Sequence, residues 1–151
     1  MASPLARKRH AVSVSVFVIV RQDDNVLLLR QANTGWKDGC WSLPAGAHDG
    51  NETLEQSAVR ELREETGLEA ASQNLRLTHV LHCRTGDDGS EWLGMFFLVK
   101  RWKHAPVLGE PSKHDEWGWF ALDQLPVPTI DYTRQGLQHS LAGIAFSTFG
   151  W

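Results

Sequence analysis

Cysteine is scarce in this sequence, and no long hydrophobic run occurs. Only two cysteines are found among the 151 residues, Cys40 and Cys83, far apart and without the spacing of metal ligands. A disulfide framework is therefore not needed, and a reducing, cytoplasmic location is the expected one. No stretch reaches the roughly 20 consecutive apolar residues that cross a bilayer. These absences argue against a disulfide-stapled secreted fold and against helical membrane spans, so no membrane partner is expected.

Net charge is also low, at -3, with 15 Lys and Arg against 18 Asp and Glu. Sequence-independent binding of DNA or RNA depends on many Lys and Arg contacts with phosphates, so no nucleic acid polymer is expected as a partner. No internal repeat, low-complexity block or linker divides the chain. A single domain is therefore expected over residues 1–151, with residues 1–10 a flexible basic tail.

The predicted elements alternate between strands and helices. Two hairpins, a helix, a further short strand and a closing helix are predicted from β-branched runs, turn signals and apolar spacing. The first hairpin is predicted at residues 11–20 and 26–30, and the helix at 53–66. The second hairpin follows at residues 75–85 and 91–102, the short strand at 117–122 and the closing helix at 132–146. This order predicts the α/β fold class, with a mixed β-sheet covered by helices on both faces.

The helix predicted over residues 53–66 has clear start and stop signals. Thr53 and Gln56 have the spacing of a capping box, in which each side chain bonds the backbone N–H of the other residue. Gly67 follows the last turn, where a left-handed residue commonly ends a helix.

Three glutamates of this helix, Glu61, Glu64 and Glu65, fall within one arc of about 100° on a helical wheel. Glu65 lies between Leu54 and Ala58, at the edge of the apolar stripe. An ionised carboxylate there costs several kcal/mol unless it is paired, hydrogen-bonded or bound to a metal. Three carboxylates together suit Mg²⁺, which prefers oxygen ligands. The alternative is an ordinary solvated acidic face.

The residues around these glutamates have a defined spacing. Residues 46–68 match G-x5-E-x7-R-E-U-x-E-E-x-G-U, with U an aliphatic residue, at every specified position. The matching residues are Gly46, Glu52, Arg60, Glu61, Leu62, Glu64, Glu65, Gly67 and Leu68. In this motif the sequence resembles the Nudix hydrolases. The resemblance implies a Nudix-type α/β/α sandwich that binds Mg²⁺ or Mn²⁺ and hydrolyses a nucleoside diphosphate linked to another group.

The resemblance also implies roles for single residues. The metal ligands would be the carbonyl of Gly46 and the carboxylates of Glu61, Glu64 and Glu65, and these glutamates would be catalytic. The residues with structural roles in the motif would be Glu52, Arg60 and Gly67.

The general base is not fixed in position among relatives. It could come from the helix or from a second loop, where Glu116 in the run "KHDEWGWF" is a candidate for a base or an additional metal ligand. The alternative is that Glu116 and its neighbour Asp115 are surface acids.

Substrate contacts are predicted with less support from the motif. Among seven tryptophans, the four that flank the expected cleft could stack on a nucleobase, although core packing is the alternative for each. These four are Trp36, Trp41, Trp117 and Trp119. Ser42 lies four residues before Gly46, where some relatives place a polar base-reading side chain. The basic residues that could reach phosphate oxygens are Arg30, Lys37 and Arg84, unless they are merely solvated.

Three functions remain open at this point. The first is hydrolysis of a (deoxy)nucleoside triphosphate by attack of water on phosphorus. The second keeps this chemistry for ADP-ribose, a nucleotide sugar or a dinucleoside polyphosphate. The third is a non-catalytic nucleotide sensor, although such modules commonly lose signature acids and none is missing here. A homodimer is also open, because the apolar "FSTFGW" at the C-terminus could pack on a neighbouring subunit or on its own core.

Overall fold

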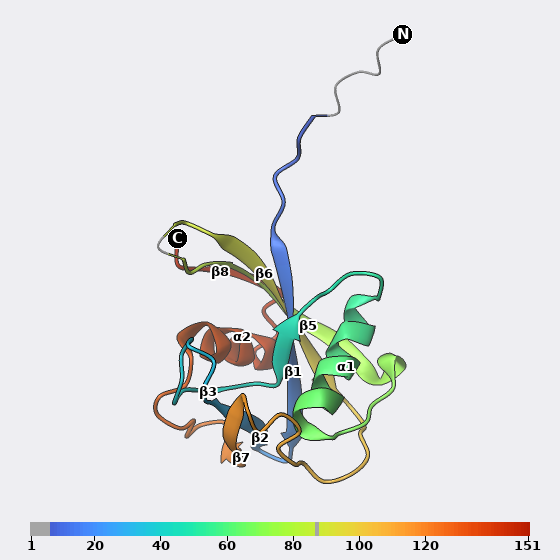
Figure 1. The fold of residues 1–151 in the computed structure, drawn as a ribbon. Helices are drawn as coiled ribbons and strands as arrows, with labels where there is room; N and C mark the ends of the chain where they lie inside the picture. The colour runs from blue at the N-terminus through green and yellow to red at the C-terminus, as the bar shows by residue number, and fades with distance from the viewer. Residues whose placement is uncertain (1–6, 87) are drawn as a thin grey trace.

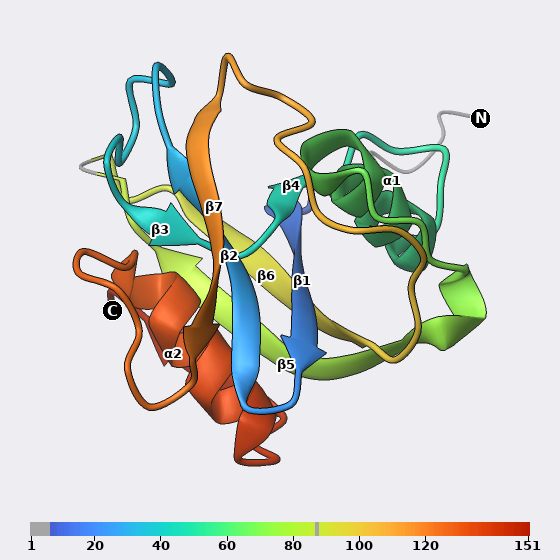
Figure 2. The same cartoon turned by 90° about the horizontal axis from the view of Figure 1, so that it is seen from below.

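A computed structural model describes residues 7–86 and 88–151 of the chain, and Figures 1 and 2 show it from two sides. Eight strands of the described residues form one mixed sheet, with two α-helices and a short 3-10 helix, η1, around it. In chain order the elements are β1 (Ser13–Gln22), β2 (Asn25–Gln31), β3 (Trp41–Ser42), β4 (Ala45–Ala47), α1 (Leu54–Thr66), η1 (Ser72–Asn74), β5 (Leu75–Arg84), β6 (Glu91–Val99), β7 (His114–Ala121), α2 (Asp131–Leu141) and β8 (Phe146–Phe149).

Strand β1 runs through the middle of the sheet. It pairs in parallel with β6 along most of its length, and β4 pairs with it in antiparallel fashion from Ser15 to Phe17. Only its last residues pair with β2, which otherwise pairs with β7 and β3. The predicted hairpin therefore forms at its turn, and its strands then diverge (Figure 2). The short strand β4 beside β1 brings the segment around Gly46 to α1.

Side chains of β1 alternate between two hydrophobic cores, since successive residues of a strand point to opposite faces. Phe17 and Ile19 pack in the core that contains Leu137 of α2. Val18 packs in the core that contains Leu62 of α1. The two helices thus cover opposite faces of the sheet, and the predicted α/β fold class is confirmed.

The chain after α2 differs from the prediction, which extended the closing helix to residue 146. Helix α2 ends at Leu141, and Gly143 has a φ of 74°, a left-handed conformation that terminates helices. The following segment forms β8, which pairs in parallel with β5 at the sheet edge. The second predicted hairpin, β5 with β6, is confirmed. Strand β7 begins at His114, three residues before the predicted start.

Several expectations about the termini and the cysteines can be placed. Of the predicted basic tail, residues 1–6 lie outside the described residues, and residues 7–10 are exposed. Both cysteines are free thiols. Within the described ranges, no helix has the length and apolar character needed to span a bilayer.

Candidate active site

Helix α1 begins and ends as its sequence signals predict. The Oγ1 of Thr53 accepts a hydrogen bond from the N–H of Gln56 at 3.1 Å, and the Gln56 side chain accepts one from the N–H of Thr53 at 2.8 Å. Gly67 has a φ of 71°, and its N–H donates to the carbonyl of Arg63 at 2.9 Å. Both caps fix the helix boundaries and thereby the face that carries the three glutamates.

Glu65 lies inside the protein, as its position on the wheel predicts. Its side chain accepts one hydrogen bond, from the N–H of Ala45 at 3.0 Å, and the residue is only 6% exposed. Burial raises the pKa of Glu65 well above its ordinary value. None of the ion pairs among the described residues includes this carboxylate. A buried acid of this kind needs a further source of positive charge to ionise.

Glu61 lies directly against Gly46. A Cβ atom on Gly46 would fall 2.1 Å from the Cδ of Glu61, so only glycine leaves room for the carboxylate beside β4. Burial raises the pKa of Glu61, and the neighbouring guanidinium of Arg60 opposes this shift. The first glycine of the motif therefore lets a helix carboxylate reach the sheet.

Arg60 connects the loop before α1 to the helix. Its Nη2 and Nε donate to the two carboxylate oxygens of Glu52 at 2.8 and 3.2 Å. Its Nη1 also donates to Glu61 at 2.9 Å and to Glu64 at 3.3 Å. These bonds raise the pKa of Arg60 above its ordinary value, and they lower the pKa of Glu52 below its ordinary value. The wheel did not predict the contacts with the two helix glutamates, because it ignores the reach of a long side chain.

A fourth carboxylate, Glu110, lies near the glutamates of α1 and was missed by sequence reasoning. The loop after β6 packs on the end of α1, where the N–H of Gly109 donates to the carbonyl of Glu65 at 2.9 Å. Burial is the main cause of the raised pKa of Glu61 and of Glu65, and the negative charge of Glu110 adds a smaller contribution in the same direction. Lys113 pairs with Glu110 at 3.3 Å. No motif marks this loop, so its position depends on tertiary contacts that the sequence does not display.

The predicted candidates Glu116 and Arg30 lie opposite each other on β7 and β2. Arg30 pairs with Glu116 at 3.2 Å and with Asp115 at 2.7 Å. The guanidinium also lies 5.7 Å from the ring centre of Trp41, which is itself buried edge-on against Phe120. Among the described residues, no hydrogen bond or ion pair joins these predicted residues to the glutamates of α1.

The oxygen atoms at this edge of α1 suit a hard divalent cation. The donors are the carboxylates of Glu61, Glu64 and Glu65 and the carbonyl of Gly46, which are ligands that Mg²⁺ prefers. The close approach of Glu61 to Gly46 and the burial of Glu65 without a paired cation fit such an ion. In the part of the chain that the structure describes, no three His, Cys, Asp or Glu side chains already meet as a metal-binding group. Instead, Arg60 contacts two of the glutamates.

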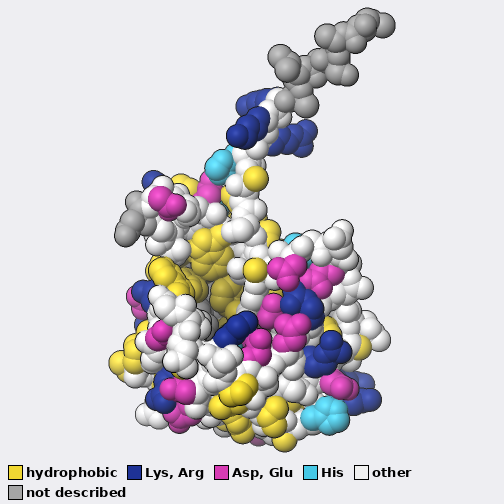
Figure 3. Space-filling view, viewed as in Figure 1, with side chains coloured by type: hydrophobic (Ala, Val, Ile, Leu, Met, Phe, Trp, Pro, Cys, Tyr) yellow, Lys and Arg dark blue, Asp and Glu magenta, His cyan; other side chains and the backbone are white. Residues whose placement is uncertain are grey.

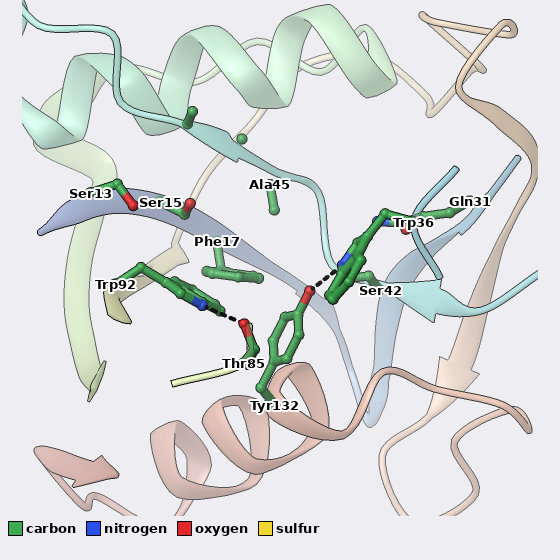
Figure 4. A pocket seen from close by; sticks show the side chains of 12 residues that line it. Ser13, Ser15, Phe17, Gln31, Trp36, Ser42, Ala45, Thr85, Trp92 and Tyr132 are labelled. Atoms are coloured by element: carbon green, nitrogen blue, oxygen red, sulfur yellow. Dashed lines mark hydrogen bonds between the residues drawn. The ribbon is translucent and has the colours of Figure 1, made fainter. Parts of the chain in front are cut away.

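A cavity of about 390 Å³ adjoins this acidic edge. Its lining residues are Ser13, Ser15, Phe17, Gln31, Trp36, Ser42, Ala45, Gly46, Ala47, Thr85, Trp92 and Tyr132, none of which is charged. Figure 4 shows Ala45 on one side and Tyr132 with Thr85 on the opposite side. In Figure 3 a hollow lined by hydrophobic side chains lies next to a cluster of acidic and basic ones. Because its lining is uncharged and largely aromatic, as a cavity that takes a nucleoside would be, we call this space the nucleoside cavity.

Aromatic rings form much of the wall of the nucleoside cavity. Phe17, Trp92 and Tyr132 pack on one another, with centroids 5.1 to 6.3 Å apart. Trp36 projects from the loop after β2 and is 49% exposed. A 3.4 Å hydrogen bond from its Nε1 to the Tyr132 hydroxyl spans the cavity edge (Figure 4). The Nζ of Lys37 lies over the Trp36 ring, 5.5 Å from its centre, and the exposed remainder of the ring borders the cavity.

Polar side chains inside the cavity differ in how their bonds are satisfied. The hydroxyl of Ser42 pairs with that of Thr133 at 2.9 Å. The Oε1 of Gln31, by contrast, is buried and has no hydrogen-bond partner among the described residues. A buried unpaired acceptor costs about 1–3 kcal/mol, which a ligand N–H group would recover.

The structure thus brings together only some of the residues predicted for substrate contact. Ser42 and Trp36 line the nucleoside cavity, and Lys37 and Arg84 line a neighbouring one. The larger cavity side chains that were not predicted include Phe17, Gln31, Trp92 and Tyr132. They come from four separate elements, and no local spacing links them.

The fold and the acidic helix together define a Nudix-type domain. The model of the NUDIX domain matches residues 9–139, so the chain belongs to this family. Its members hydrolyse phosphorus anhydrides, generally with divalent metal ions.

Individual relatives cover different shares of the chain. An ADP-ribose pyrophosphatase of Methanocaldococcus jannaschii is 43% identical over 122 residues, which are 81% of this chain and 69% of that protein. A putative 8-oxo-dGTP diphosphatase 3 of Mycobacterium tuberculosis is 45% identical over 67 residues, which are 44% of this chain and 31% of that protein. The crystal structure of a MutT NUDIX hydrolase from Burkholderia pseudomallei superimposes with a TM-score of 0.78 at 30% identity, covering 86% of this chain and 98% of its own.

Proposed function

We propose that this chain hydrolyses a phosphoanhydride bond in a nucleoside diphosphate linked to another group, with a (deoxy)nucleoside triphosphate as the first substrate to test. One observation carries this proposal. An uncharged, aromatic cavity of nucleoside size opens directly beside the acidic edge of α1, with Gly46 common to both. Its volume lies at the small end of the roughly 300–1,000 Å³ that ligand pockets span.

The residues proposed to hold Mg²⁺ or Mn²⁺ are Glu61, Glu64, Glu65 and the carbonyl of Gly46. When bound, such an ion polarises phosphoryl oxygens and lowers the pKa of a bound water. Arg60 keeps the loop and the helix in register through Glu52, and it balances part of the charge of the glutamates. Glu65 is the ligand that depends most on the ion, since no protein cation pairs with it among the described residues.

We assign the role of general base to Glu110 in place of Glu116. Glu110 lies on a loop that packs on the end of α1, and its charge acts on Glu61 and Glu65, whereas Glu116 has no hydrogen bond or ion pair with any glutamate of α1 among the described residues. Its carboxylate would take the proton of the attacking water, and Lys113 would hold it in position.

The nucleoside cavity would take the uncharged part of the substrate. Trp36 offers a face for stacking on the base, and the rings of Phe17, Trp92 and Tyr132 close the other side. The unpaired Oε1 of Gln31 would accept a hydrogen bond from an amino group of the base. The phosphates would then lie at the Gly46 side, next to the glutamates.

ADP-ribose is the second candidate substrate. The relative named as an ADP-ribose pyrophosphatase is similar over 81% of this chain, whereas the putative 8-oxo-dGTP diphosphatase is similar over 44%. Both candidates use the same chemistry and the same acidic edge, so they differ only in the group that leaves.

Hydrolysis of a panel of nucleotides, followed by chromatographic separation of the products, with Mg²⁺ or Mn²⁺ and with excess chelator, tests the proposal. The panel contains the common and oxidised triphosphates, ADP-ribose, nucleotide sugars and dinucleoside polyphosphates. We expect at least one compound to be hydrolysed, with Glu65→Gln reducing turnover roughly 10²–10³-fold. Glu55→Gln, a change in the exposed first turn of α1, is the matched control and should retain activity. Tight binding without any turnover would instead favour the nucleotide sensor.

A further inference from the structure

A second, smaller cavity lies beside the nucleoside cavity. It has a volume of about 260 Å³ and shares Trp36, Thr85 and Tyr132 with its neighbour. Its other lining residues are Lys37, Arg84, Ile130, Asp131 and Phe149. Thr85 and Tyr132 are the residues that face Ala45 across the nucleoside cavity in Figure 4, so the second cavity lies at the end away from the acidic edge. We call it the basic cavity.

The two cations of the basic cavity rest on aromatic rings. The Nζ of Lys37 lies 5.5 Å from the ring centre of Trp36, and the guanidinium of Arg84 lies 5.4 Å from that of Trp151. Within residues 7–86 and 88–151, neither cation takes part in an ion pair. Asp131, the one acid of the lining, is paired with Arg134 at 3.3 Å. The cavity therefore has a net positive lining.

The loop that carries Lys37 is organised by a neighbouring acid. Asp38 accepts hydrogen bonds from the N–H and the hydroxyl of Thr34 at 3.1 and 2.6 Å, and from the N–H of Gly35 at 2.9 Å. These bonds lower the pKa of Asp38, so the loop stays tied at neutral pH. Lys37 itself has a φ of 51°, which is uncommon for a residue with a side chain. The backbone at Lys37 therefore has a defined conformation next to Trp36.

The nucleoside cavity separates two charged ends. At one end lie the glutamates of α1, where a metal ion would attract the scissile anhydride. At the other end lie Lys37 and Arg84, and no charged residue lines the space between. A substrate that matches this pattern has two anionic groups with an uncharged nucleoside between them.

We propose that the basic cavity is a second phosphate subsite, which binds a phosphate on the ribose of the substrate nucleotide. The substrate class is then a nucleoside diphosphate derivative that carries an additional 2′- or 3′-phosphate. This inference rests on the proposed function, because it takes the nucleoside to lie in the first cavity. Lys and Arg are the usual phosphate-binding side chains, and 260 Å³ suits a terminal group rather than a whole nucleotide.

Binding without metal tests the subsite independently of catalysis. The probes are AMP, adenosine 2′,5′-bisphosphate and adenosine 3′,5′-bisphosphate, titrated in chelator and followed by calorimetry and by tryptophan fluorescence. We expect one bisphosphate to bind about 10-fold or more tightly than AMP, as a charge-assisted contact allows, and this preference to fall with added salt. The bisphosphate that binds more tightly identifies the ribose position that carries the additional phosphate.

Variants then locate the preference. Lys37→Gln and Arg84→Gln should each reduce the bisphosphate preference and together abolish it, while AMP binding stays near the original value. Arg101→Gln, which removes an exposed cation that lines neither cavity, is the matched control. Equal affinity for AMP and both bisphosphates, or a preference that persists in the double variant, overturns the proposal.

Turnover of matched pairs separates this inference from the proposed function. Coenzyme A and dephospho-coenzyme A differ by one 3′-phosphate, and NADP⁺ and NAD⁺ differ by one 2′-phosphate. A lower KM for one phosphorylated member, lost in the double variant, supports both ideas. Hydrolysis of both members of each pair with equal KM overturns the subsite and leaves the hydrolase assignment intact. No hydrolysis of any panel compound, with the binding preference retained, overturns the hydrolase assignment and supports the subsite.

Discussion

The acidic edge of α1 and the nucleoside cavity lie side by side but are built in opposite ways. The acidic edge consists of charged side chains from one helix and its flanking loop, tied together by Arg60. The cavity has no charged lining residue, and its side chains come from strands, loops and α2. The comparison indicates that the chemistry is specified locally in the sequence, whereas recognition depends on how distant elements meet.

The contrast also has an electrostatic reason. A cation in the cavity wall would compete with a metal ion for the glutamates, and an acid there would repel the substrate phosphates. A neutral wall avoids both effects and leaves the anhydride to be drawn to the Gly46 side. The two regions can therefore be perturbed separately, and the predictions below use this separation.

The largest effect is expected for Glu110 at the acidic edge. Glu110→Gln should lower kcat roughly 10²–10⁴-fold with little change in KM, because the variant cannot accept the proton of water. Steady-state kinetics on the best substrate of the panel, with circular dichroism to confirm folding, measure this change. The control is Glu116→Gln, because Glu116 pairs with Arg30 on the neighbouring strand, and this variant should keep most of its activity. A large loss in Glu116→Gln and none in Glu110→Gln would reverse our assignment.

A somewhat smaller loss is expected where the two regions meet, at Gly46. Gly46→Ala places a Cβ atom 2.1 Å from the Cδ of Glu61, so the carboxylate must move. The backbone of Gly46 has no left-handed φ, so the fold should survive. We expect activity to fall about 10²-fold, the order of loss that a 1 Å misplacement can cause.

A double-mutant cycle shows whether Gly46 acts through Glu61. If it does, Gly46→Ala should add little to the loss already caused by Glu61→Gln, because both disturb the same carboxylate. If the loss of activity in the double variant equals the product of the two single losses, the two residues act independently and this coupling is contradicted.

Inside the cavity, Gln31 should affect recognition and leave the chemistry unchanged. Gln31→Leu keeps much of the volume and removes the buried acceptor, so bases with and without an amino group should become equivalent. The matched substrates are ATP and ITP, which differ in this group at one ring position. We expect a preference for ATP of roughly 10-fold in kcat/KM, lost in the variant while kcat for ITP is kept. A preference that Gln31→Leu leaves untouched would exclude this residue as the reader of the base.

Residues near the motif were predicted well because their interactions are short-range. The caps of α1 involve Thr53, Gln56 and Gly67, all within one or two turns of the helix ends. The inward position of Glu65 followed from the helical period alone. Glu110 could not be found in this way, since it reaches α1 through a loop that packs on backbone carbonyls.

Failures further along the chain have similar causes. The helical spacing of Leu137, Leu141 and Ile144 suggested one continuous helix, but Gly143 ends it and the chain turns into β8. Gly143 is a helix stop signal in the sequence, but the prediction followed the apolar spacing and continued the helix past it. Trp41 could not be told from Trp36 by sequence, because both are aromatic residues of one loop region, and only packing shows that Trp41 is buried against Phe120.

Helix α2, which carries Tyr132 to the nucleoside cavity, is anchored to β5 and β8 by a buried polar network. His79 of β5 is 1% exposed, and its Nδ1–H donates to the carbonyl of Ile144 at 2.6 Å. Its Nε2 then accepts from the hydroxyl of Ser147 at 2.8 Å. The Ser147 oxygen in turn accepts from Gln135 at 3.1 Å and from His139 at 3.0 Å. With His79 neutral, all of these bonds are satisfied.

The smallest expected effect is a pH dependence of stability on the cavity side of the molecule. Burial lowers the pKa of His79 in the folded protein, whereas the unfolded chain titrates near the ordinary value of about 6.5. Above that pH both states are neutral and the network contributes fully. As pH falls below it, the unfolded chain binds a proton that the folded chain does not, so stability declines by at most about 1.4 kcal/mol per pH unit for this group. Urea unfolding from pH 7.5 to 5 measures the slope.

A variant separates His79 from the other groups that titrate in this range. His114 is also buried with a lowered pKa, and it contributes a slope of the same sign. The slope of each histidine variant is therefore compared with the slope of the parent protein. His79→Gln should be less stable at pH 7.5 and should lose part of the slope, and His114→Gln should lose another part. The raised pKa values of Glu61 and Glu65 contribute a slope of opposite sign, which neither variant changes. Amide exchange should show the loss first in α2 and β8 and leave α1 protected. If α1 opens first as the pH falls, the acidic edge and the cavity are not independently stabilised, and the separation on which the comparison depends is wrong.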